Sequence, residues 1–423
     1  MTFDKSLLEP NEVSINLKLF KFIRFFHIFD PNIRKICNIN VYHLAFHIIN
    51  CVIGCIVIYG LLGYFTEMED VFNIINQIQL MFCILIYYSS LLKIITFLYK
   101  ANNIWDLLLV SKINFLTSTQ CKTHIDILHK YRNKSIKITN IISTIGVVTT
   151  LEWIMYPLLL QLLQKEDANK SNQRFENIFN FRFPVTINYY NNNYVIFYIM
   201  ESFIAMYLLY IYPCIYVAVD VFFISVCYVM IAHYEMIKNA YGNINTELIS
   251  ENNNKNKNYC NGCIGDLVSI MMDQQKHFVK LKLFYSTYKF IILSTVIINS
   301  GSIIILTYAS VVIFMSSETI SILSVIKLIS AFGYVFIVLF FLCYLIDRIN
   351  NKMESVHFGM YSCNWTAMNL RSKKMLLLSM QLNNANKLMI KITPKKIINL
   401  QFYNSVIITC YNVLSTMLKV RSN

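Results

Sequence analysis

Charge, glycine and proline are all scarce in this chain of 423 residues. Charged residues make up 14% of the sequence, whereas soluble globular domains carry about 25%. Only 10 glycines and 6 prolines occur, which leaves little room for a glycine-rich loop that binds phosphate. Hydrophobic residues make up 56%, and the mean hydropathy is +0.49. This composition excludes an ordinary soluble domain and indicates a membrane protein.

Enzyme motifs are also nearly absent. No Ser-His-Asp order, protein-kinase motif set or HExxH zinc motif occurs. His43 and His47 form one pair of possible ligands and Cys260 and Cys263 another, and two ligands do not complete a zinc site. We therefore expect no enzymatic activity, no metal and no cofactor. Most of the 12 cysteines lie inside apolar runs, so we also expect no extracellular disulfide.

Seven apolar runs are long enough to cross a hydrocarbon core of ~30 Å. They cover residues 41–63, 71–98, 136–163, 194–232, 284–315, 319–347 and 396–418. The fourth run is long enough for two spans bent at Pro213, or for one helix that projects into water. We take it as one helix because no polar turn interrupts it. The predicted fold class is an all-α membrane protein with seven transmembrane helices.

The basic residues predict the orientation. In the seven-span arrangement, 28 of the 37 Lys and Arg residues fall on one side of the membrane. Cytoplasmic segments carry this excess, so we predict a cytoplasmic amino terminus and an extracellular carboxyl terminus. The same placement argues against a nucleic-acid partner despite the net charge of +14. It also argues against a G-protein-coupled receptor, which has the opposite polarity.

This orientation divides the chain into seven segments. They are a cytoplasmic leader (1–40), spans one to four (41–232), a cytoplasmic loop with a helical extension (233–283), spans five and six (284–347), cytoplasmic anchor helices (348–395), the last span (396–418) and an extracellular tail (419–423). In the loops, Asn252 to Asn258 is typical of a flexible linker, whereas residues 266–288 and much of 347–384 are predicted to be helical. Asn169, in an Asn-Lys-Ser sequon, is predicted to lie outside the cell and to be a glycosylation site.

The charges inside the predicted spans include Lys93, Glu152, Asp220, Lys289 and Lys327. Each is a candidate functional residue, but snorkelling towards a membrane face or one structural ion pair is the more common explanation of such charges. They form no regular ladder, which argues against a voltage sensor or a proton relay.

The last apolar run carries a polar stripe. Its members recur at steps of three and four, so they share one face of a helix: Gln401, Ser405, Thr409, Asn412 and Thr416. Two interpretations stay open. Either the stripe forms hydrogen bonds with neighbouring helices, or it lines a water-filled path.

Aromatic and methionine side chains gather in the predicted outer half of the spans. They favour an apolar cavity for a small uncharged ligand, although ordinary helix packing uses the same residue types. The candidate cavity residues are Met81, Phe82, Gly146, Thr149, Thr150, Trp153, Phe203, Met206, Tyr207 and Tyr210. We interpret Gly146, Thr149 and Thr150 as small residues that leave space beside Trp153.

The tail of the chain carries a loose motif. Tyr361, Trp365 and Arg371 follow one another at fixed spacing, then a Leu376–Leu378 run, then the last span. This motif and the seven-span layout resemble the insect odorant receptors. The chain departs from the pattern at residues 391–394, where many members of that family have a glycine-containing step.

The resemblance implies a ligand-gated cation channel in the plasma membrane of a sensory neuron, in which a tuning subunit assembles with a shared odorant co-receptor into a heterotetramer. It implies a small volatile ligand, a pore lined by the last helix with Val413 at its constriction, and a subunit anchor that includes Tyr361, Trp365 and Arg371. The alternatives are a gustatory receptor of the same superfamily and a membrane transporter.

Overall fold

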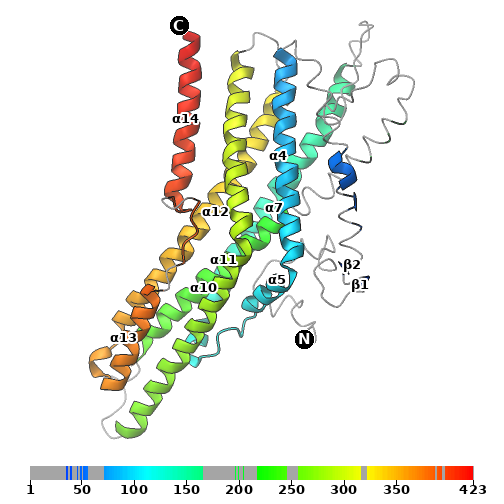
Figure 1. Cartoon of the computed structure of the whole chain (residues 1–423). Helices are drawn as coiled ribbons and strands as arrows, with labels where there is room; N and C mark the ends of the chain where they lie inside the picture. Colours follow the sequence, from blue (N-terminus) through cyan, green and yellow to red (C-terminus); the bar gives the residue numbers. More distant parts are fainter. Residues whose placement is uncertain are drawn as a thin grey trace.

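The molecule is a bundle of long helices (Figure 1). The computed structural model describes residues 35–36, 39–40, 45, 48–49, 51–55, 71–164, 196, 199, 203, 217–244, 256–315, 322–385, 388–392 and 396–422. Apart from the two-residue strands β1 (Lys35–Ile36) and β2 (Ile39–Asn40), which pair antiparallel with Ile36 opposite Ile39, the described elements are helices.

The long helices are α4 (Val71–Tyr99), α7 (Ile125–Gln164), α10 (Val217–Asn243), α11 (Asn256–Met315), α12 (Ile322–Ser362) and α14 (Leu400–Ser422). Shorter helices connect them: α5 (Ala101–Leu108), η2 (Leu109–Ser111), α6 (Thr119–Lys122), η6 (Trp365–Ala367) and α13 (Leu370–Ala385). In Figure 1, α11 and α12 run the full height of the bundle, α13 lies at its lower end, and α14 stands at its upper end.

The helices confirm most of the apolar runs but extend beyond them. Helix α11 has 60 residues, which at 1.5 Å per residue is roughly 90 Å, about three times the thickness of a hydrocarbon core. Helices α7 and α12 have 40 and 41 residues. The helical predictions for 266–288 and 347–384 are therefore confirmed, because these residues belong to α11, α12 and α13. We call residues 233–244, 256–283, 348–362 and α13 the anchor bundle.

The linker prediction was partly wrong. Helix α11 already begins at Asn256, so Asn256 to Asn258 and the Cys260–Cys263 pair are helical. Residues 252–255 lie outside the described residues. The run of asparagines has low helix propensity, but the following apolar residues Leu267 and Ile270 are buried in the bundle, and this packing holds the helix.

By length and composition, three described helices can cross a membrane: Val217–Asn243, Ile264–Val312 and Val325–Ser362. A fourth candidate is a broken one, because Ile84–Tyr99 and Ala101–Ser111 meet at an angle of 77°. The bend follows Tyr99, and Lys100 at the bend donates to the carbonyl oxygen of Ser286 in α11. The chain thus leaves the axis of α4 at the level of Ser286.

Helix α10 is the centre of the core, and its residues from Val217 to Tyr234 are all buried. It packs against α7 and α12 along its length. In the anchor bundle, an idealised Cβ on Gly359 of α12 would lie 2.5 Å from the carbonyl oxygen of Lys238 in α10. Only glycine allows these two helices to approach so closely.

The anchor bundle is also held by a buried carboxylate. Asp273 of α11 accepts hydrogen bonds from the backbone nitrogens of Thr117 and Ser118 at 2.9 and 2.8 Å and from the Thr117 hydroxyl at 2.9 Å. This clasp fixes the loop before α6. Beside it, the rings of His233 and His277 pack with centroids 5.4 Å apart, as two members of an aromatic cluster.

Candidate functional site

Helix α14 has one face packed on the bundle and one face turned away from it. Asn399 caps its amino end by accepting a hydrogen bond from the backbone nitrogen of Phe402 at 3.0 Å. The packed face is formed by Tyr403, Val406 and Cys410, which are buried. The Tyr403 ring contacts two phenylalanines of α12, with centroid distances of 5.2 Å to Phe336 and 5.5 Å to Phe340.

The polar stripe occupies the opposite face. Gln401, Thr409, Asn412 and Thr416 are exposed, and Ser405 and Val413 are half-buried. The hydroxyl groups of the stripe donate within α14: Ser405 to Phe402, Thr409 to Ser405 and Thr416 to Asn412, at 2.7 to 2.8 Å. Such back-bonding satisfies a hydroxyl on an apolar helix without a neighbouring helix. Among the described residues, the hydroxyl groups of the stripe therefore do not join α14 to another helix of the same chain by hydrogen bonds.

The structure separates the candidate cavity residues into two groups. Phe82 and Thr150 are buried, Gly146 is enclosed by neighbouring helices, and Thr149 is half-buried. Met81 and Phe203 are 51% and 63% exposed, so these two side chains lie at the surface of the bundle and not in its interior. Met81 precedes Phe82 on α4, and a step of about 100° turns it outward when Phe82 points inward.

Other members of that set stay untested. Trp153 is in α7, but its side chain lies outside the described part of the structure. Met206, Tyr207, Tyr210 and the predicted glycosylation site Asn169 also fall outside the described residues.

Gly146 has a different role from the one expected. A Cβ built on it would lie 2.6 Å from Cγ2 of Val217 in α10 and 3.1 Å from the ring of Tyr334 in α12. The glycine thus leaves no open space, because two neighbouring side chains fill it. Beside it, the Thr150 hydroxyl donates to the Gly146 carbonyl oxygen at 2.8 Å. Gly146 marks the point where α7, α10 and α12 meet.

Two of the charges inside the apolar runs form an ion pair. The Lys93 ammonium of α4 lies 2.7 Å from Oδ1 of Asp220 in α10, with side-chain exposures of 0% and 10%. Asp220 lies one turn along α10 from Val217, the residue that fills the space at Gly146. Lys327 is also buried, Glu152 is half-buried and Lys289 is exposed. The structural alternative is thus confirmed for Lys93 and Asp220.

The predicted anchor residues lie at the surface of the anchor bundle. Tyr361 and Trp365 are 66% and 41% exposed, and Arg371 is exposed too. Large apolar neighbours share this surface: Phe358, Leu370, Leu377, Leu378 and Leu382. Such a concentration of exposed apolar side chains is typical of a protein–protein interface.

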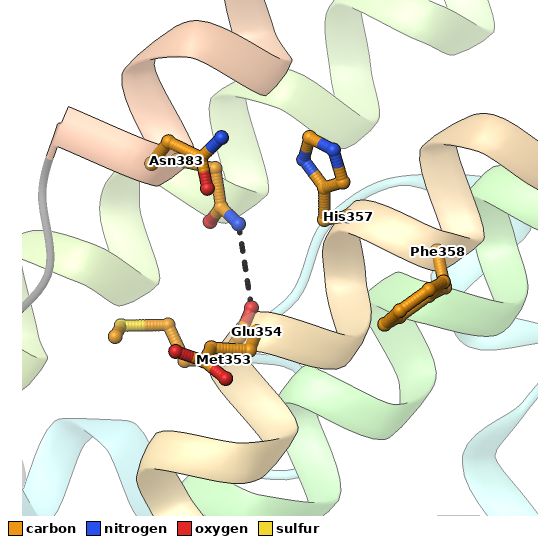
Figure 2. A pocket seen from close by; sticks show the side chains of 6 residues that line it. Met353, Glu354, His357, Phe358 and Asn383 are labelled. Atoms are coloured by element: carbon orange, nitrogen blue, oxygen red, sulfur yellow. Dashed lines mark hydrogen bonds between the residues drawn. The ribbon is translucent and has the colours of Figure 1, made fainter.

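A small pocket of about 160 Å³ opens beside this surface, between α12 and α13 (Figure 2). It is lined by Met353, Glu354, His357, Phe358, Asn383 and Asn384. The Asn383 amide donates to the Met353 carbonyl oxygen at 3.4 Å, which ties the two helices together across the pocket. Its volume is below the range of about 300–1,000 Å³ typical of ligand sites.

Cys121 and Cys363, two cysteines outside the predicted spans, are not reactive. Burial raises the pKa of the Cys121 thiol to about 12 and that of Cys363 to about 11. Both remain protonated at neutral pH, so neither supplies a thiolate for metal binding or nucleophilic attack. The described residues hold no group of three or more His, Cys, Asp or Glu arranged for a metal ion.

Comparison with known proteins identifies the family. The sequence profile described as 7tm Odorant receptor matches residues 73–411, which is most of the chain. The chain belongs to the odorant receptor family. No curated protein matches it significantly in sequence.

Solved odorant receptors share the fold. The insect olfactory receptor OR5 from Machilis hrabei, in complex with eugenol, aligns with a TM-score of 0.65 at 14% identity, covering 96% of this chain and 99% of OR5. OR5 without the ligand aligns with a TM-score of 0.68 at the same identity and coverage. The predicted all-α membrane fold is confirmed. This odorant receptor is a membrane protein, and its family functions in olfaction.

Some contacts were not predicted from the sequence. The Asp273 clasp and the Gly359–Lys238 contact join residues far apart in the chain, and neither carries a local motif. Lys93 and Asp220 were recognised as unusual charges, but nothing in the sequence of this odorant receptor paired one with the other. The one indication of a pair was that one long apolar run contains a positive charge and another contains a negative charge.

Proposed function

We propose that this odorant receptor is the ligand-binding subunit of an odorant-gated cation channel, with seven spans, a cytoplasmic amino terminus and an extracellular carboxyl terminus. The observation that carries the proposal is the polar stripe of α14. It is exposed, its hydroxyls bond within their own helix, and the helix packs on the bundle by its other face. A membrane helix that presents polar groups away from its own subunit requires water or partner subunits on that side.

In the proposed assembly, copies of α14 from four subunits surround a central pore, and an odorant co-receptor supplies the other subunits. Thr409, Asn412 and Thr416 then line the water-filled path. Val413, half-buried at the edge of the stripe, forms the hydrophobic constriction that closes by excluding water. The exposed apolar surface around Tyr361 and Trp365 meets the same surface region of neighbouring subunits in the anchor.

The proposed ligand is a small, neutral, apolar volatile. The OR5 structure in complex with eugenol supports this class, because eugenol is a ligand of that receptor and the two folds agree. The ligand would lie in the outer half of the bundle beside Trp153 and above the packed contact at Gly146. Its binding favours the channel state with the wider constriction, and only the difference in affinity between states drives opening.

The test is electrical. Cells that express the chain with and without an insect odorant co-receptor are exposed to a panel of volatile compounds, and whole-cell currents are recorded. We expect odour-evoked cation currents only with both subunits. Currents from this chain alone that equal those of the pair would overturn the heteromeric assembly, and an absence of current from a pair that reaches the cell surface would overturn the channel proposal.

Two variants test the assigned positions. Val413→Ala removes two methyl groups from the constriction. It should raise the basal current or shift gating, because the smaller side chain widens the hydrophobic constriction. Val325→Ala, the same change on the exposed side of α12, serves as the control and should leave gating unchanged. Trp153→Ala should raise the odorant concentration for half-maximal current without reducing surface delivery; an unaltered concentration dependence would remove Trp153 from the ligand site.

A further inference from the structure

The outward face of α7 changes character along its length. Towards its carboxyl end it is exposed and apolar, with Ile141, Val148, Leu151 and Met155 pointing away from the bundle. Towards its amino end the same face carries Lys130, Lys134 and Lys137, all exposed at steps of three and four. The face therefore passes from a surface suited to lipid chains to a basic one within the single turn that separates Lys137 from Ile141.

Contacts with other helices place this change at the end of the membrane-crossing part. The Ser135 hydroxyl of α7 lies 3.5 Å from that of Ser225 in α10. About one turn along α10 from Ser225, Phe222 packs against Phe97 of α4, and Phe223 packs against Tyr288 of α11. Lys100 reaches Ser286 of α11 where α4 bends away. Lys134 and Lys137 thus lie at the level where α4 leaves the bundle.

A second helix adds another cation at this level. Arg348 of α12 lies with its guanidinium carbon 5.9 Å from the Tyr344 ring centroid, and Lys134 lies with its ammonium 6.0 Å from the Tyr228 ring centroid. Lys352, one turn along α12 from Arg348, forms an ion pair with Glu235, which also accepts the hydrogen bond of the Tyr131 hydroxyl, so Arg348 lies near Tyr131 of α7. We call Lys130, Lys134, Lys137 and Arg348 the basic edge.

One nearby acidic group, Glu235, is already neutralised. Glu235 of α10 accepts a hydrogen bond from the Tyr131 hydroxyl at 2.6 Å and forms an ion pair with Lys352 at 2.8 Å. None of the four cations of the basic edge forms an ion pair with another residue in the described part of the chain. In addition, the Tyr228 hydroxyl is buried and has no hydrogen-bond partner among these residues.

We infer that the basic edge binds the anionic headgroup of a phospholipid in the cytoplasmic leaflet, with its acyl chains along Ile141 and Val148. The inference rests on the orientation in the proposed function, which puts this level at the cytoplasmic membrane surface. Lys134 and Arg348 supply charge-assisted donors to the headgroup phosphate. Basic clusters directly cytoplasmic of a membrane helix attract anionic lipid in this way.

The test measures lipid binding by the full-length chain purified in detergent. Fluorescently labelled phosphatidylserine and phosphatidylcholine are titrated, first with the natural protein and then with Lys134→Gln/Arg348→Gln. The control is Lys122→Gln/Lys374→Gln, which removes the same charge from two exposed lysines elsewhere on the cytoplasmic side. A second variant, Lys134→Gln/Lys137→Gln, changes only exposed side chains. It replaces the first variant in the titration if the change at Arg348 prevents folding.

We expect phosphatidylserine to bind more tightly than phosphatidylcholine, and the basic-edge variants to lose most of that preference. Each basic side chain near the surface contributes about a fivefold factor, so a double variant should weaken binding by roughly 25-fold. Equal loss in the control variant would overturn the site. Binding of soluble glycerophosphoserine as tightly as the intact lipid would overturn the lipid as its occupant.

The measurements distinguish a failure of the lipid site from a failure of the channel proposal. If odour-evoked currents are present but the preference for phosphatidylserine is the same in all variants, only the lipid site is wrong. A different result separates the orientation from the site. If the preference follows the basic edge but an antibody reaches an epitope on the anchor bundle of intact cells, the lipid belongs to the other leaflet, and both the orientation and the assignment to the cytoplasmic leaflet are overturned.

Discussion

The Lys93–Asp220 ion pair offers the sharpest test of the bundle. Both side chains are buried and meet at 2.7 Å, and the two residues, on α4 and α10, are 127 positions apart in sequence. Removing one partner takes the opposite charge of the pair away from a buried charged group, which in proteins costs about 3–5 kcal/mol. Replacing both by apolar residues of similar size removes both charges together and is often neutral or stabilising.

The perturbation is therefore a double-mutant cycle of Lys93→Met and Asp220→Leu. Each single variant should lower the free energy of unfolding by about 3–5 kcal/mol, and the double variant should lie close to the natural protein. The assay heats detergent-solubilised protein and measures the fraction that still elutes as a folded species in size-exclusion chromatography. Each single variant should lose this fraction at a temperature several degrees lower.

Lys289→Met is the matched control, because Lys289 is an exposed lysine in the same part of the bundle. It should change stability by less than about 1 kcal/mol. A double variant as unstable as either single variant would refute the reasoning, since apolar packing at the site would then not replace the pair. So would single variants as stable as the control.

The remaining predictions concern two contacts of the anchor bundle. Gly359→Ala should destabilise the protein by about 1–3 kcal/mol, because its Cβ would lie 2.5 Å from a backbone oxygen that cannot turn aside. Gly333→Ala, where nothing lies within 4 Å, should be neutral or stabilising by up to about 1 kcal/mol; equal thermal loss in both would contradict the close contact. Asp273→Ala should cost about 3 kcal/mol and speed amide hydrogen exchange at Thr117, because two backbone donors lose a charged acceptor. Asp273→Asn should fall between, and unchanged exchange in both variants would count against the clasp.

The local pattern of the sequence predicted the helices well. A helix of an apolar run is specified by residues close together in sequence, and the end of α4 at Tyr99 falls one residue beyond the predicted end at Leu98. The stripe of α14 was likewise visible from its spacing, and the structure added only which way it faces. Periodicity and hydrophobicity are short-range properties, so the sequence displays them directly.

The contacts between helices were much harder to predict from the sequence. The outward turn of Met81 and the filled space at Gly146 depend on the rotation of each helix about its axis. A run that is apolar all round does not specify that rotation, because no face is distinguished by polarity. The pairing of Lys93 with Asp220 depends in addition on which helices are neighbours. These are long-range properties that emerge only when the bundle is assembled.

The unbroken length of α11 has a consequence for how this receptor can diversify. Each residue added to or deleted from a continuous helix rotates everything beyond it by about 100°. A single deletion near the middle of α11 would turn Thr295 and Ser302, now buried among other helices, out of register with the clasp at Asp273. Substitutions along α11 are therefore compatible with new specificities, whereas changes in its length are not, and natural variation in length should concentrate in the connections between helices.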